Sequence, residues 1–218
     1  MAPPAPSSRT TLPRAVLYLL LLLSLQVAAP AAAVMDPAER ETLLRVMESV
    51  SADRDWREAA GTDPCSAPWP GLECRPGTAA ARMHVARLDF GVPPNPTCSD
   101  TATFPLAAFA LPELRALFLV GCFRNPGAVA AFTLPPASNL SASRLQQLSV
   151  RSNPSLAGAL PPQLARLRSL RVLTVSQNAL VRGAVPEGIG DLAGLVHLDL
   201  SYNSLTGPVP ARLGGLRG

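Results

Sequence analysis

The chain has 218 residues, of which 48% are hydrophobic, 16% charged and 5% aromatic, with a formal net charge of +4. All 19 cationic side chains are arginines, and only Arg166, Arg168 and Arg171 lie close together. A positive charge this small and dispersed does not favour a nucleic-acid-binding protein, so no nucleic-acid partner is expected. The length and apolar content are sufficient for a sizeable core in one or two domains.

The first 33 residues have the layout of a cleaved secretory signal. An apolar run over 15–29 follows Arg9 and Arg14 and precedes small residues that end at Ala33. An uncleaved membrane anchor is the alternative, but this run is shorter than the roughly 20 residues that a spanning helix needs. We therefore expect a protein that is secreted or held at the extracellular side of the plasma membrane, with no membrane span in this chain.

Residues 36–50 predict an amphipathic helix. Asp36 suits the N-cap and Pro37 the first helical position. The apolar side chains of the segment fall on one stripe, formed by Leu43, Leu44, Met47 and Val50. We expect this helix to close the end of a core as a lid, held in place by Trp56, Trp69 and the loop between them.

Four cysteines follow the signal: Cys65, Cys74, Cys98 and Cys122. An even number of cysteines in an oxidising compartment favours disulfide bonds. Sequence alone allows three pairings, and the pairing in chain order, Cys65 with Cys74 and Cys98 with Cys122, would cross-link neighbouring segments. Zinc modules have C-x-x-C half-sites, which the spacing of Cys65 and Cys74 does not match, so no metal site is expected.

An internal repeat is the strongest pattern in the sequence. Leu148, Leu173 and Leu198 lie 25 residues apart, and their neighbours share the frame L-x-x-L-x-[LV]-x-x-N. An earlier copy starts at Leu114 and has Cys122 in the place of the asparagine, and a fainter copy over 85–90 opens the series. Each L-x-L core predicts a short strand, and equivalent strands would stack into a parallel sheet.

Two further features of the repeat complete the predicted coil. Asn153, Asn178 and Asn203 end the frame, and an inward amide can satisfy the backbone groups that a turn leaves unpaired. Beyond a glycine-proline bend, leucines or isoleucine recur every three residues, as at Leu164 and Leu167, which suits 3₁₀ turns. The predicted fold is an α/β solenoid with a parallel sheet on the concave face, short 3₁₀ turns on the convex face and a helical, disulfide-stapled N-terminal cap.

The full frame, L-x-x-L-x-L-x-x-N-x-L-x-G-x-[IV]-P, resembles the plant-specific class of leucine-rich repeat. This class is found in receptor-like kinases, kinase-less receptor-like proteins and polygalacturonase-inhibiting proteins. The segment CSAPWPGLEC over 65–74 is similar to the C-x-W-x-G-V-x-C signature of their capping domain, in which the two cysteines pair; Leu72 replaces the usual valine. Residues 53–74 and the following LDFGVPPNPTC resemble the receptor-like subgroup of the too-many-mouths receptor and the Piriformospora indica-insensitive proteins.

The resemblance covers residues 36–218 and implies a domain organisation. We expect the signal at 1–33, a capping domain with a degenerate first repeat at 34–110, and plant-type repeats at 111–218 that are open at the C-terminus. Proteins of this kind continue through more repeats, so we expect the sequence to be C-terminally truncated. Asn139 begins the usable N-glycosylation sequon, and a glycan there would mark a solvent-facing edge.

The candidate ligand-binding residues are the outward positions of the predicted strands, because the concave face of such solenoids usually contacts the partner. The register gives Phe118, Gln147, Ser149, Arg151, Thr174, Ser176, Gln177, His197, Asp199, Ser201 and Tyr202.

No enzyme and no cofactor are expected. His197 and Asp199 have residue types of a hydrolytic triad, but both would point outward in parallel from one strand, with no G-x-S-x-G elbow. The sequence has no glycine-rich loop with H-R-D and D-F-G segments, so it carries no kinase.

We expect the extracellular recognition module of a kinase-less receptor-like protein. Its partners would be a peptide or protein ligand and a receptor-like kinase co-receptor, in cell-surface signalling or defence. The alternative is a secreted inhibitor of a cell-wall hydrolase, of the polygalacturonase-inhibitor type, which would use the same face. A third interpretation is a truncated product without independent activity, because an open last repeat exposes an apolar edge.

Overall fold

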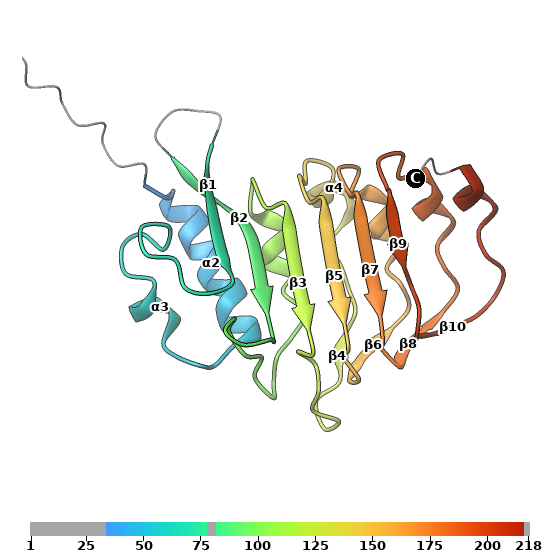
Figure 1. The fold of residues 1–218 in the computed structure, drawn as a ribbon, viewed down its shortest axis with the longest axis horizontal. Helices are drawn as coiled ribbons and strands as arrows, with labels where there is room; N and C mark the ends of the chain where they lie inside the picture. Colours follow the sequence, from blue (N-terminus) through green and yellow to red (C-terminus); the bar gives the residue numbers. More distant parts are fainter. Residues whose placement is uncertain (1–33, 78–81, 216–218) are drawn as a thin grey trace, which may run out of the picture. The chain divides into compact units, whose positions relative to one another are not determined.

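The structure, a computed structural model, describes residues 34–77 and 82–215, so the expected signal at 1–33 lies outside the described residues. The described chain coils through successive turns, each of which adds one strand to a main sheet (Figure 1). The strands of this sheet lie in the order β1 (Leu72–Pro76), β2 (Met83–Phe90), β3 (Ala116–Val120), β5 (Gln147–Arg151), β7 (Val172–Ser176) and β9 (His197–Asp199).

The register of the main sheet agrees with the sequence repeat. The strands from β2 to β9 are parallel and pair a single row of leucines: Leu88, Leu117, Leu148, Leu173 and Leu198. The first four of these leucines are at most 1% exposed, so the row forms the centre of the core. The predicted α/β leucine-rich-repeat solenoid is therefore confirmed. Only β1 runs antiparallel to its neighbour β2, as part of the N-terminal cap.

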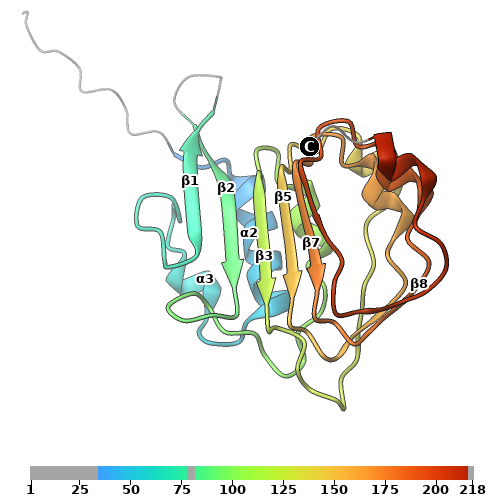
Figure 2. The same cartoon turned by 45° about the vertical axis from the view of Figure 1, so that its right-hand side comes forward.

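Short 3₁₀ turns lie on the side of the coil away from the main sheet, as expected (Figure 2). Leu164, Leu167 and Ile189 of these turns face the core and are fully buried, whereas Leu106 at the start of the first turn is exposed. The spacing of three follows from the hydrogen bonds, since the Leu167 N–H donates to the Leu164 carbonyl at 3.1 Å. The four turns are η1 (Leu106–Ala110), η2 (Pro162–Arg166), η3 (Glu187–Asp191) and η4 (Ala211–Gly215).

A second, smaller parallel sheet and a short helix occupy segments that the sequence predicted only as bends and links. The glycine of the L-x-G segment ends or follows each of the last three strands of this sheet, and Gly158, Gly183 and Gly207 all have positive φ. A side chain is disfavoured in that conformation, which explains the glycine in the repeat. The strands are β4 (Ala130–Ala131), β6 (Leu156–Gly158), β8 (Leu180–Gly183) and β10 (Ser204–Leu205), and the helix is α4 (Ala137–Leu140).

The repeated asparagines form a hydrogen-bonded ladder at the turn after the main sheet. Asn178 is fully buried; its Nδ2 donates to the carbonyls of Val150 and Ser176, both at 3.0 Å, and its Oδ1 accepts from the Asn153 N–H at 3.1 Å. Asn203 Oδ1 accepts from the Asn178 N–H at 3.0 Å, so each amide serves the preceding repeat. The role predicted for these asparagines is confirmed.

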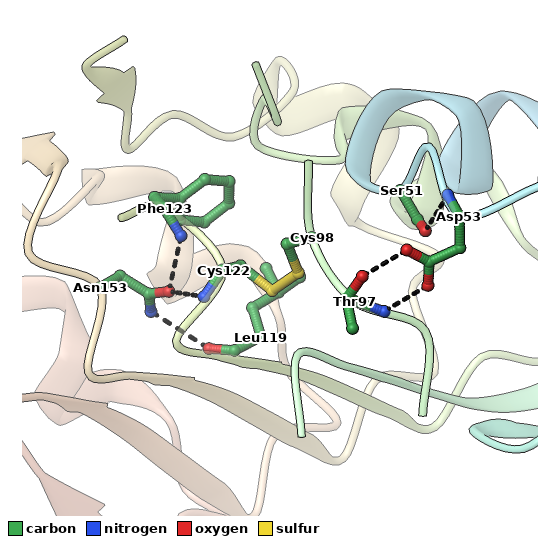
Figure 3. Close-up of a disulfide and its surroundings, with 8 residues drawn as sticks. All are labelled: Ser51, Asp53, Thr97, Cys98, Leu119, Cys122, Phe123 and Asn153. Atoms are coloured by element: carbon green, nitrogen blue, oxygen red, sulfur yellow. Dashed lines mark hydrogen bonds between the residues drawn. A yellow bond between two sulfur atoms is a disulfide. The ribbon is translucent and has the colours of Figure 1, made fainter. Parts of the chain in front are cut away.

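Cys122 begins this ladder in place of an asparagine (Figure 3). Its backbone N–H donates to Asn153 Oδ1 at 2.7 Å, while its sulfur is bonded to Cys98. The loop that carries Cys98 is also tied to the cap, because the Thr97 N–H donates to an oxygen of Asp53 at 2.7 Å. The disulfide therefore connects the cap to the first turn of the coil.

The N-terminal cap is built around helix α2 (Pro37–Val50). The Asp36 side chain accepts from the Ala38 N–H at 2.9 Å, which confirms the predicted N-cap. The predicted apolar stripe is fully buried and consists of Leu43, Leu44, Met47 and Val50.

Two tryptophans and a disulfide hold the remainder of the cap. Trp56, at the start of α3 (Trp56–Ala59), lies with its ring centroid 5.2 Å from that of Trp69. Cys65 is bonded to Cys74, so both pairings in chain order are confirmed.

Glu39 fixes α2 to the main sheet, a role that its place in the first helical turn did not reveal. It is 5% exposed; its carboxylate accepts from the Val85 N–H at 2.9 Å and lies 2.7 Å from His84 Nδ1. A buried carboxylate that loses such bonds leaves its partners unsatisfied.

We expect Glu39→Ala to lower the free energy of unfolding by about 2 to 3 kcal/mol, because the Val85 N–H and His84 lose their charged partner. Denaturant titration followed by circular dichroism measures this change. The matched control is Glu41→Ala on the same helix, where the carboxylate pairs with Arg57 on the exposed surface and little change is expected. Equal effects of the two variants would contradict a structural role for Glu39.

Candidate ligand-binding site

The main sheet presents one face to its leucine core and the opposite face, which we call the concave face, outward. Side chains alternate between these faces, so residues that flank the core leucines line up across neighbouring strands. The first row consists of Arg87, Ala116, Gln147, Val172 and His197. The second row consists of Asp89, Phe118, Ser149, Thr174 and Asp199, and the third contains Val120, Arg151 and Ser176.

Three of the candidate residues are not accessible, and the prediction that they are exposed is wrong. Ser149, Thr174 and Ser176 are 5%, 8% and 1% exposed, although they lie on the concave face. Their short side chains stand between larger neighbours on the adjacent strands, such as Phe118 beside Ser149 and Arg151 beside Ser176. A ligand lying on this face would contact those larger neighbours first.

The remaining candidates form an accessible strip along β3, β5, β7 and β9 and the residues that follow β7 and β9. Tyr202 is 80% exposed, while Gln147 and Phe118 are half-buried. The other accessible members are Arg151, Gln177, His197 and Ser201, with Asp199 half-buried between them. The strip thus combines a cation, an imidazole, a carboxylate, amides and a phenol.

Tyr202 and Gln177 occupy equivalent positions just before the ladder asparagines. Together with Ser152 they have positive φ, at 55° for Ser152, 58° for Gln177 and 55° for Tyr202. Ser152 Oγ lies 2.7 Å from Gln177 Oε1 and donates to it, which fixes these two side chains at the edge of the face.

Hydrogen bonds from Ser201, just past the end of β9, favour the ionised form of the Asp199 carboxyl. Ser201 Oγ donates to Asp199 Oδ1 at 2.6 Å, and the Ser201 N–H donates to the same atom at 3.0 Å. These hydrogen bonds keep the pKa of the Asp199 carboxyl below its ordinary value. Because Ser201 is committed to this carboxylate, the arrangement does not provide an activated nucleophile beside His197.

Sequence reasoning missed two functional candidates on β2, Arg87 and Asp89. The Arg87 guanidinium lies 4.2 Å from the centroid of the Phe118 ring and 2.9 Å from Asp89 Oδ2. Burial raises the pKa of Asp89, and the adjacent Arg87 opposes that rise. The faint repeat over 85–90 could have predicted both residues, since Arg87 and Asp89 flank Leu88 just as the other candidates flank the later leucines.

The described residues contain no group of three or more histidine, cysteine, aspartate or glutamate side chains placed to hold a metal ion. None of the helices in residues 34–77 and 82–215 is long and apolar enough to span a bilayer. The predicted glycosylation site, Asn139, is exposed on α4.

Comparison with known proteins supports the same class as the repeat geometry. Residues 194–216 match the family described as Leucine Rich Repeat. Receptor like protein 29 of Arabidopsis thaliana is 45% identical over 141 residues, which are 64% of this chain and 29% of that protein. The chain has the leucine-rich-repeat fold and is similar in sequence to plant receptor-like proteins.

This leucine-rich-repeat chain is also similar to Piriformospora indica-insensitive protein 2 of Arabidopsis thaliana, with 32% identity over 142 residues. The match covers 64% of the chain and 32% of that relative, so the chain spans about a third or less of the length of the relatives it matches. The resemblance predicted from the repeat frame and the capping signature is confirmed.

Among solved structures, the leucine-rich-repeat chain shares its fold with the ectodomain of the plant membrane receptor kinase GASSHO1/SCHENGEN3 from Arabidopsis thaliana, in complex with CASPARIAN STRIP INTEGRITY FACTOR 2. The TM-score is 0.62 at 24% identity, and the match covers 82% of this chain and 20% of the receptor ectodomain. This similarity is one of fold.

Proposed function

We propose that this chain is the recognition part of an extracellular receptor-like protein, which binds a peptide ligand or a partner receptor kinase through its concave face. The accessible strip of varied polar and aromatic side chains along β3, β5, β7 and β9 and the residues that follow β7 and β9 carries this proposal. A rigid sheet holds these side chains in place, so little conformational entropy is lost when a ligand binds. Tyrosine and arginine, the residue types most enriched in binding hot spots, are both present as Tyr202 and Arg151.

Three other observations support the proposal. The signal-like residues 1–33 and the two disulfides suit a secreted protein. One relative carries a receptor-like name, and the solved ectodomain with the same fold is itself bound to a partner. We also propose that Asn139 carries a glycan, since it is exposed on α4 and begins an N-x-S sequon.

The proposal predicts a partner whose binding depends on the concave face. The secreted chain would be screened by biolayer interferometry against plant receptor-kinase ectodomains and secreted plant peptides. The double variant His197→Ala/Tyr202→Asn should weaken the binding of a captured partner by about tenfold or more, because it removes two exposed side chains of the strip. Asparagine tolerates the positive φ at position 202, so the fold should be kept.

The matched control is Arg168→Ala, which alters an exposed arginine next to the convex turn η2. This variant should bind like the original chain. Failure to find any partner in the screen, or unchanged binding by the double variant, would count against the proposed function.

A further inference from the structure

A small pocket opens on the concave face beside the middle of β2 and the N-terminal ends of β3 and β5, which are the upper ends of β3 and β5 in Figure 1. Its volume is about 170 Å³. Three guanidinium groups and one carboxylate line it, together with two amides. The charged and amide residues are Arg75, Arg87, Arg115, Glu73, Gln146 and Gln147.

The pocket exists because the first row of the concave face has a small residue at one position. Arg87, Ala116 and Gln147 are register neighbours on β2, β3 and β5. Ala116 has no side chain beyond its Cβ, so a gap remains between the two longer side chains on either side. A pocket of this size admits a side chain or a chain terminus and is too small for a larger group.

Two of the three guanidinium groups are fixed by partners within the chain. Arg87 packs on the Phe118 ring and pairs with Asp89, and Arg75 lies 2.9 Å from Glu73. Arg87 and Arg75 therefore form preorganised walls with positive charge. The pair between Arg75 and Glu73 is exposed and therefore weak, so it leaves the Arg75 guanidinium able to attract a further anion.

Arg115 is the guanidinium that can bind a new partner. Its nearest carboxylate oxygen among the described residues is Glu113 Oε2, at 3.8 Å, which is beyond hydrogen-bond distance. Glu113 already pairs more closely with Arg144, at 2.5 Å. Arg115 thus brings unused donors to the pocket, where the amide of Gln147 can add another.

We propose that this pocket binds a carboxylate group of an extended peptide lying on the concave face, either an acidic side chain or the C-terminal carboxylate. The planar fork of a guanidinium matches both oxygens of a carboxylate, and charge-assisted bonds of this kind are about twice as strong as neutral ones. The inference deepens the proposed function and rests on it only in assuming that the natural ligand is a peptide.

Ligand-observed NMR tests the pocket directly with three tripeptides. Acetyl-Ala-Glu-Ala-amide presents a side-chain carboxylate, acetyl-Ala-Ala-Ala presents a C-terminal carboxylate, and acetyl-Ala-Gln-Ala-amide presents neither. Saturation transfer from the protein should reach at least one acidic tripeptide and not the neutral one, and which acidic tripeptide responds identifies the source of the carboxylate. Arg115→Gln should weaken that binding by about tenfold, because it removes the charged donor.

Ala116→Leu is the second variant, since it fills the pocket without changing any charge and should also abolish the saturation transfer. Arg168→Gln, which removes an exposed charge beside the convex turn η2, is the matched control and should leave binding unchanged. Melting temperatures equal to that of the original chain would show that the variants are folded. Equal signals from the acidic and neutral tripeptides, or full binding by Arg115→Gln, would overturn the proposal.

The two proposals fail in different ways. If an acidic tripeptide binds but the screen finds no partner, the result supports the pocket proposal and contradicts the proposed function. If a partner binds and neither Arg115→Gln nor Ala116→Leu changes the binding of that partner or of the tripeptides, the result contradicts the pocket proposal and supports the proposed function.

Discussion

Replacing Asn178 by alanine should lower the free energy of unfolding by roughly 2 to 4 kcal/mol, because it removes three hydrogen bonds to buried backbone groups. The affected groups are the carbonyls of Val150 and Ser176 and the N–H of Asn153. Water cannot replace the amide, since Asn178 is fully buried. Denaturant unfolding followed by circular dichroism measures the change.

Two further variants distinguish the loss of the ladder hydrogen bonds from the loss of side-chain volume. Asn178→Asp keeps the shape and the acceptor but loses both N–H donors, so it should remain strongly destabilising. Asn203→Ala removes an equivalent but only partly buried amide, where water can reach the freed groups, and should cost less. A loss for Asn178→Ala no larger than that for Asn203→Ala would contradict the ladder as a principal stabilising feature.

Removing the disulfide between Cys98 and Cys122 should cost about 3.5 kcal/mol, from the entropy of the loop that it closes. The loop between Cys65 and Cys74 is shorter, with a separation of 9 residues against 24, so its removal should cost about 2.7 kcal/mol. The measurement compares the unfolding of two double variants, Cys98→Ser/Cys122→Ser and Cys65→Ser/Cys74→Ser.

Loss of each disulfide should also destabilise a different part of the chain. Cys122 lies next to the first rung of the asparagine ladder, so hydrogen exchange in the Cys98→Ser/Cys122→Ser variant should increase in both the cap and β3. The Cys65→Ser/Cys74→Ser variant should affect the cap alone. Exchange confined to the cap in both variants would argue against a connection between cap and coil through Cys122.

The positions of the core leucines and ladder asparagines could be predicted from sequence because each position demands one chemistry. A leucine row fills the core, and an amide at 153, 178 and 203 supplies donors and an acceptor together, so the residue types recur with the period of the coil. The same logic predicted the cap helix from its N-cap and apolar stripe.

Features that depend on neighbouring side chains could not be predicted in the same way. Whether Ser149 or Ser176 is accessible depends on Phe118 and Arg151 on the next strands, and not on its own position in the repeat. The burial of Glu39 likewise depends on β2, where its partner His84 lies 45 residues later in the chain. The pocket around Ala116 forms because the side chain at this position is small, and no sequence motif predicts such a gap.

Site-specific photo-crosslinking tests most directly whether the concave face is the binding surface. His197→p-benzoylphenylalanine places a crosslinker on the accessible strip, and Ala193→p-benzoylphenylalanine places it at an exposed position next to the convex turn η3. With a partner from the binding screen, we expect crosslinks from position 197 and none from position 193. Crosslinks from position 193 alone would contradict it.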